Sequence, residues 1–273
     1  MSSINPKHLI LKFLLANEGD PLSARDAILA CGLFGIRDNS VRVALARLAA
    51  AGLIEAAGRG TYQLGPNATG LAEDVSTWRS AEHRVREWGG AWICAHCGAL
   101  GRSDRSALAK RARALQLLGF RELDDELFVR PDNLIGGVIA VRERLHKLGL
   151  AVTAAVFLAS QFDEARETRA RQLWDGKSLT HAYRATREKL EQWLARADEL
   201  EPDVAARESF LIGDAAIRLM VFDPLLPAPL VDTAARRACA EAVQHFDETG
   251  HVIWRRLHAT NAATDKPTHI TLN

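Results

Sequence analysis

The sequence predicts a helix-rich α+β protein built from three modules. Three observations point to this class. Residues 1–68 contain three helical patterns followed by a short hairpin pattern, residues 76–162 alternate strand and helix patterns, and residues 163–273 have helical spacing almost throughout. We expect a separate domain in each range, because a chain of 273 residues is near the length at which one core splits into several.

The N-terminal module has the element order of a winged helix-turn-helix. Apolar residues at helical spacing in residues 6–17 predict a first helix, and Ser23 is a good cap for a second. Asp38 or Asn39 is expected to cap a third helix. Two short strands then pair across residues 58–60, where glycines flank an arginine and permit a tight turn.

The third helix has the pattern of a helix that enters the major groove of DNA. Its apolar residues repeat every three or four positions, so they share the face that docks on the first two helices. The opposite face is short and polar with arginines at its margins, and an arginine can bond guanine or phosphate in two places. The predicted DNA-binding residues are Asn39, Ser40, Arg42, Val43 and Arg47, with Arg59 at the hairpin tip.

The charge of this module predicts a homodimer on double-stranded operator DNA. Residues 1–68 contain seven basic and five acidic residues, so one copy would bind weakly because phosphate neutralisation supplies much of the affinity. Two copies would read half-sites about one helical turn apart. The alternative is a protein-interaction adaptor without DNA binding, in which Arg47 braces the fold through a buried ion pair.

The middle module has the order β-α-β-β-α-β, which is the ferredoxin-like arrangement. A helix around residues 78–88 is expected to precede it. Its first strand contains Cys94 and Cys97, which would point to opposite faces because side chains alternate along a strand. A metal-dependent nuclease remains an alternative function, although this strand holds no carboxylate to bind the ion. We therefore predict no catalytic residue, no metal site and no cofactor.

The bulk sequence indicates a cytoplasmic protein without a membrane segment. No apolar run approaches the roughly 20 residues that a bilayer-spanning helix needs. Four cysteines in a chain of this size do not form a disulfide framework, which fits a reducing compartment. Residues 175–178 end like a phosphate-binding loop but lack its earlier glycine, so we expect a turn between helices there.

Motifs in all three modules carry a family resemblance. They are residues 33–36, 40–48, 52–54 and 58–64, then Trp92, residues 111–120 and 127–131, and finally residues 173–175, Tyr183 and residues 222–227. Together they resemble the PaaX family, which comprises repressors of phenylacetic acid degradation and their relatives. The resemblance extends over nearly the whole chain.

The resemblance implies a ligand-released transcriptional repressor of an aromatic-compound catabolic operon. The winged helix would bind DNA, the ferredoxin-like domain would dimerise, and the helical C-terminal domain would complete a ligand-responsive dimer. The implied effector is an aryl-acyl coenzyme A thioester or a related aromatic acid. Residues suited to an aromatic ligand and its phosphates are Trp174, Tyr183 and Arg111, with core packing or a solvated helix face as the alternative for each.

Overall fold

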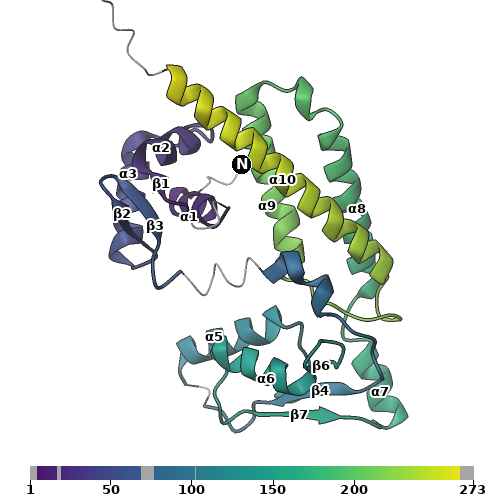
Figure 1. Ribbon diagram of the computed structural model, residues 1–273. Helices are drawn as coiled ribbons and strands as arrows, with labels where there is room; N and C mark the ends of the chain where they lie inside the picture. The colour runs from purple at the N-terminus through teal and green to yellow at the C-terminus, as the bar shows by residue number, and fades with distance from the viewer. Residues whose placement is uncertain (1–4, 17–19, 69–76, 102, 265–273) are drawn as a thin grey trace, which may run out of the picture. The chain divides into compact units, whose positions relative to one another are not determined.

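The computed structural model describes residues 5–16, 20–68, 77–101 and 103–264. They form a helix-rich α+β protein with two antiparallel sheets, which confirms the predicted class (Figure 1). Contacts divide the chain into a first unit (residues 1–77, 196–213 and 246–273) and a second unit (residues 78–195 and 214–245). The C-terminal helical segment thus contributes to both units. The boundaries of the three expected domains stay a prediction.

The first unit begins with three helices and a small sheet. The helices are α1 (Pro6–Ala16), α2 (Ala24–Gly32) and α3 (Asp38–Ala50), and the strands are β1 (Leu22–Ser23), β2 (Ile54–Gly58) and β3 (Thr61–Leu64). The sheet has the order β1-β3-β2 and is antiparallel throughout. Ser23 caps α2, since its hydroxyl oxygen accepts a hydrogen bond from the backbone N–H of Asp26 at 3.0 Å.

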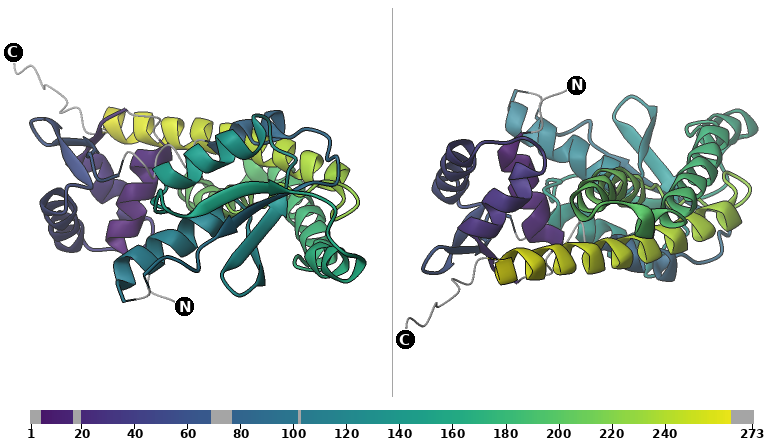
Figure 2. Two further views of the ribbon diagram at one scale, coloured as in Figure 1. Left: turned by 90° about the horizontal axis from the view of Figure 1, so that it is seen from below. Right: turned by 90° about the horizontal axis from the view of Figure 1, so that it is seen from above.

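The second unit contains a four-stranded antiparallel sheet with two helices on one face (Figures 1 and 2). Its elements follow the order β-α-β-β-α-β, and the strands lie in the order β5-β6-β4-β7. In chain order they are β4 (Trp92–His96), α5 (Arg105–Leu117), β5 (Arg121–Asp124), β6 (Leu127–Pro131), α6 (Gly137–Lys147) and β7 (Ala155–Ala159).

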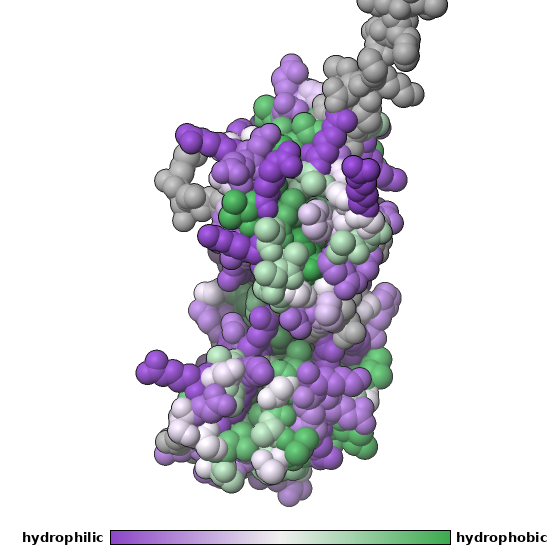
Figure 3. Space-filling model, turned by 90° about the vertical axis from the view of Figure 1, so that its left-hand side faces the viewer, coloured by the Kyte–Doolittle hydropathy of each residue, from purple (hydrophilic) through white to green (hydrophobic). Residues whose placement is uncertain are grey.

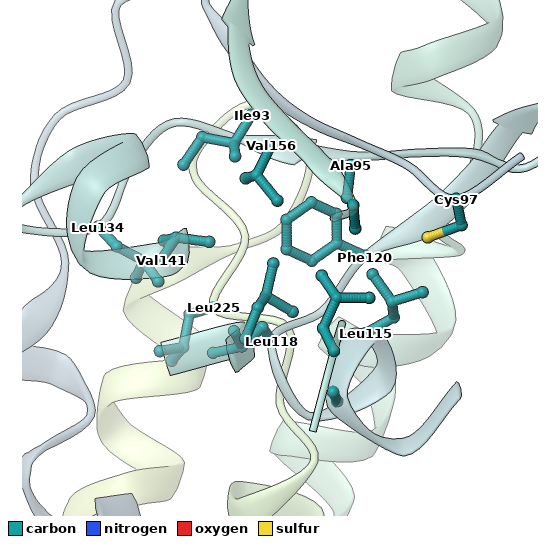
Figure 4. Close-up of a cluster of buried hydrophobic side chains, with 14 of the residues drawn as sticks. Ile93, Ala95, Cys97, Leu115, Leu118, Phe120, Leu134, Val141, Val156 and Leu225 are labelled. Carbon is teal, nitrogen blue, oxygen red and sulfur yellow. The ribbon is translucent and has the colours of Figure 1, made fainter. Parts of the chain in front are cut away.

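The core of the second unit lies between this sheet and its two helices (Figure 4). Alternate residues of β4, Ile93 and Ala95, point into it beside Leu115 of α5 and Val141 of α6. Leu225, from a loop more than 60 residues after the last strand, joins the same cluster. The loop of the C-terminal segment is therefore part of the core of the sheet module.

The remaining helices belong mainly to the C-terminal part of the chain. They are α7 (Glu164–Arg171), α8 (Gly176–Leu194), α9 (Pro202–Val221) and α10 (Thr233–Thr264), with a short 3-10 turn, η3, at Ala197–Glu199. Asp175 caps α8 by accepting a hydrogen bond from the Ser178 N–H at 2.9 Å, so residues 175–178 do form a turn into a helix. Within the described ranges, no helix has the length and apolarity to span a membrane.

The expected helix around residues 78–88 is replaced by two 3-10 turns, η1 (Thr77–Ser80) and η2 (Glu82–Arg84). The reason is a competing tertiary interaction. Val85 forms a β-bridge with Leu134, and the N–H of Arg86 donates to the carbonyl oxygen of Asn133 at 2.8 Å. The backbone groups that would have continued a helix are used to pair with a distant segment.

Candidate nucleic-acid interface

The turn between α2 and α3 is closed by its own backbone. The N–H groups of Phe34 and Ile36 both donate to the carbonyl oxygen of Cys31, at 3.0 and 3.2 Å. Gly35 adopts a φ of +72°, a left-handed conformation that costs glycine little and other residues more. This short turn sets the direction in which α3 leaves α2.

One face of α3 is buried and fixes the helix on its module. Its buried residues are Val41, Ala44, Leu45 and Leu48, which all belong to one core cluster with residues of α1 and α2. They follow the spacing of three and four residues that places side chains on one side of a helix. The sequence-derived assignment of this face agrees with the structure.

The opposite face of α3 is open to solvent. Val43 lies on this face and is 42% exposed. Figure 3 views the side on which α3 lies in Figure 1, and hydrophilic side chains project there around more apolar ones. All six residues predicted to bind DNA are exposed, namely Asn39, Ser40, Arg42, Val43, Arg47 and Arg59.

The arginines of this face have no carboxylate partner among the described residues. Arg42, Arg47 and Arg59 are exposed and form no ion pair there. The alternative in which Arg47 braces the fold through a buried ion pair is therefore wrong. Unpaired, exposed guanidinium groups leave their donors available to an external anion.

The hairpin places Arg59 at its tip between two glycines. Gly60 has a φ of +74°, and its carbonyl oxygen accepts a hydrogen bond from the N–H of Ala24 at 2.8 Å. That bond ties the hairpin tip to the start of α2. The tip is thus held by the same module that holds α3.

The structure adds Arg37 to this surface. The sequence predicts Asp38 or Asn39 as the cap of α3, but the cap position is Arg37, whose side chain makes no capping bond. Asp38 lies in the first turn instead, where a negative charge is favourable near the positive end of the helix. Arg37 is exposed beside the predicted DNA-binding residues. The sequence places the cap one or two residues later, at Asp38 or Asn39, and so leaves Arg37 outside the predicted helix and its surface.

An aromatic cluster joins the turn before α3 to two helices of the C-terminal segment. Phe34 lies in that turn, and its ring centroid is 5.5 Å from that of Phe210 in α9. Phe13 of α1 lies 4.7 Å from Phe210 and 5.0 Å from Trp254 of α10. No local sequence pattern reveals this cluster, because two of its rings come from the start of the chain and two from the C-terminal helices.

The three predicted effector-binding residues do not line one site. Arg111 of α5 pairs with Glu126 at 3.5 Å on the helix-covered side of the sheet. Trp174 is buried against the opposite face, stacked 6.1 Å from Trp92, and its indole N–H donates to the carbonyl oxygen of Gly119 at 3.1 Å. The sequence grouped these residues because their side chains suit one ligand, but in the fold the sheet lies between Arg111 and Trp174.

Tyr183 is fully buried beside a charged cluster within the second unit. Arg236 of α10, itself 2% exposed, donates to Glu82 at 2.6 Å. Burial raises the pKa of Asp223, while Tyr183 and Arg236 act in the opposite direction. This cluster secures the loop after α9 within the second unit, because Arg236 also donates to the carbonyl oxygen of Leu226.

Cys94 and Cys97 point to opposite faces of the sheet region, as their spacing predicts. Cys97 packs in the core cluster with Ile93 and Ala95, whereas Cys94 lies on the alternate side of β4. Burial raises the pKa of the Cys94 thiol to about 11 and also raises that of Cys97. Both thiols are therefore protonated near neutral pH.

A comparison with known protein families finds a match in the C-terminal segment. Residues 174–256 match the family described as PaaX-like protein C-terminal domain, which confirms the predicted resemblance for that segment. A solved structure, titled "Uncharacterized protein Rv0674 from Mycobacterium tuberculosis", is similar with a TM-score of 0.58 and 23% sequence identity, covering 91% of this chain and 98% of that chain. At this identity the likeness concerns the fold. No curated protein matches the chain.

Proposed function

We propose that this chain, whose residues 174–256 are a PaaX-like C-terminal domain, is a DNA-binding transcriptional repressor of an aromatic-compound catabolic operon. Its N-terminal module acts as a winged helix-turn-helix, with α3 in the major groove and Arg59 on an adjacent phosphate or minor groove. Its ferredoxin-like sheet module serves the homodimer. A small effector, an aryl-acyl coenzyme A thioester or an aromatic acid, releases the repressor from DNA.

One observation carries this proposal. The exposed face of α3 offers unpaired arginines, while the opposite face is anchored in the core. Exposed arginine side chains without an ion pair contribute little to the stability of their own module. It is the arrangement that phosphate contacts and base readout require.

The test is binding to the DNA that lies upstream of the gene for this protein. Fluorescence anisotropy with a labelled duplex should give a dissociation constant at least about 1,000-fold lower than that for a shuffled duplex. Expression of the protein should repress a reporter gene that is placed downstream of the same DNA. Equal affinity for both duplexes, with no effect on the reporter, would refute the proposal and favour the adaptor.

A further inference from the structure

A cleft in the second unit separates the start of α8 from residues 229–232. Its volume is about 370 Å³, which is at the small end of the range of about 300–1,000 Å³ for ligand sites. One wall carries Lys177, His181 and Arg184, and the other carries Pro229, Leu230 and Val231. The two walls therefore differ in chemistry, one cationic and one apolar.

The two walls are fastened together at the base of the cleft. A Cβ atom on Gly176 would lie 1.8 Å from the carbonyl oxygen of Leu230, so only glycine permits this approach. The N–H of Asp232 donates to the hydroxyl oxygen of Thr180 at 3.2 Å, and Arg184 pairs with Asp232 at 2.6 Å. These contacts hold the cleft in shape before any ligand arrives.

The cationic wall follows from helical spacing. Lys177, His181 and Arg184 stand at positions i, i+4 and i+7 of α8, so they share one face. Arg184 is engaged by Asp232, whereas Lys177 and His181 form no ion pair within the described part of the chain. Both side chains keep their donors unpaired on this wall, and the neighbouring carboxylate of Asp175 interacts with the charge of Lys177.

Two helix N-termini also meet at the cleft. Helix α8 starts at Gly176 and α10 starts at Thr233, directly beside the lining residues. The first turn of a helix carries a partial positive charge. The capping carboxylates of Asp175 and Asp232 already bond the N–H groups of these turns, so the unpaired side chains rather than the helix ends would meet a ligand.

We propose that this cleft is the effector site and binds a small organic anion, namely a carboxylate with an apolar body. The carboxylate pairs with Lys177 and His181, and the apolar body lies against Leu230 and Val231. The cleft volume of about 370 Å³ suits one ring or a short chain. This inference rests on the proposed function, because it names the ligand that would release the repressor.

Calorimetric titration of the full chain without DNA tests the site directly. Benzoate and hexanoate are the probes, with benzamide and hexanamide as neutral matches of nearly the same shape. The acids should bind and the amides should bind at least about tenfold more weakly. Lys177→Gln should weaken the acids about tenfold. Lys189→Gln, an exposed lysine on the same helix outside the cleft, should leave them unchanged.

The inference would be overturned by no binding of either acid, by equal binding of acid and amide, or by a Lys177→Gln variant that binds as the wild type does. Binding of benzoyl coenzyme A without binding of benzoate would also overturn it. Operator affinity is measured separately on the same preparation. If the protein binds the operator but neither acid, only the assignment of the cleft as a ligand site is refuted. If it binds the acids but not the operator, the proposed repressor function is refuted and the cleft remains a ligand site.

Discussion

The arginines of α3 in the first unit and a buried arginine of the second unit have opposite environments. In the first unit, Arg42 and Arg47 of α3 are exposed to solvent, and neither forms an ion pair with a carboxylate of the described residues. In the second unit, Arg130 is 1% exposed and donates to the carbonyl oxygens of Leu118 and Pro131 and to Asn133. A formal net charge of +1 conceals this difference, because what matters for binding is which charges are free. The first kind of arginine is accessible to a partner, and the second holds the fold.

The largest expected effect is loss of a fold-holding arginine. Arg236→Met leaves Glu82 and the carbonyl oxygen of Leu226 without their buried donor. We expect a loss of about 3–5 kcal/mol in the free energy of unfolding, as for other broken buried ion pairs. Urea titration followed by tryptophan fluorescence measures it.

The neighbouring Arg237 is the matched control for that experiment. It is exposed and forms no ion pair among the described residues. Arg237→Met should change the free energy of unfolding by less than about 0.5 kcal/mol. If Arg236→Met and Arg237→Met lower the free energy of unfolding by the same amount, the distinction between fold-holding and free arginines is wrong.

The next effect concerns the free arginines of α3. Arg42→Ala and Arg47→Ala should each weaken operator binding about tenfold or more, since a contact of this kind contributes about 1–3 kcal/mol. Their unfolding midpoints should match the wild type, because neither side chain is paired in the fold. Arg207→Ala, an exposed arginine of α9, is the control and should keep full affinity. Unchanged affinity in both α3 variants would contradict the assignment of this surface.

A smaller effect is expected in the aromatic cluster beside the α2–α3 turn. Phe13→Leu keeps an apolar side chain but removes the ring contacts with Phe34, Phe210 and Trp254. The loss in unfolding free energy should be about 1 kcal/mol, since an aromatic pair contributes about 0.5–1.5 kcal/mol beyond its apolar area. Thermal denaturation measures this loss, and Phe157→Leu, at a 42% exposed phenylalanine, should be nearly neutral in the same experiment. Equal losses at both positions would show that the cluster adds nothing beyond apolar area.

The smallest effect is a pH dependence of the free energy of unfolding that arises from Asp223, which interacts with Arg236. Burial raises the pKa of Asp223, so the folded protein holds that proton more tightly than the unfolded chain, whose value is about 4. This stabilising contribution is present at low pH and is lost as the pH rises through the raised pKa. The stability of the wild type relative to Asp223→Asn should therefore fall from acid to neutral pH.

Asp175 gives the opposite sign and serves as the internal control. Hydrogen bonds from Ser178 lower its pKa, so its contribution is present above about pH 4 and is lost as the pH falls. The stability of the wild type relative to Asp175→Asn should rise from acid to neutral pH. Denaturation midpoints measured across pH check both signs, and parallel curves for the two variants would contradict them.

Local patterns predicted the elements that depend on local physics. The buried stripe of α3 follows from helical spacing, and the β-α-β-β-α-β order follows from alternating apolar patterns. The stretch at 78–88 escaped prediction because its backbone pairs with residues 133–135, a contact that no local pattern contains.

The site was only partly predictable for the same reason. The arginines of α3 were identifiable, because an amphipathic helix displays its exposed face in its own sequence. Arg111 and Trp174 were grouped by chemistry, yet the sheet separates them. The cleft was missed because its apolar wall lies some 50 residues after its cationic wall. Its one sequence signal is the spacing of Lys177, His181 and Arg184 along a single helix face.

The salt dependence of operator binding tests the central claim most directly. The logarithm of the association constant should fall linearly with the logarithm of salt concentration for the wild type. In the Arg42→Ala/Arg47→Ala double variant, the slope should be shallower by about two for each protomer if both side chains contact phosphate. An unchanged slope would show that α3 does not meet the DNA backbone, and the absence of operator binding at every salt concentration would contradict the repressor itself.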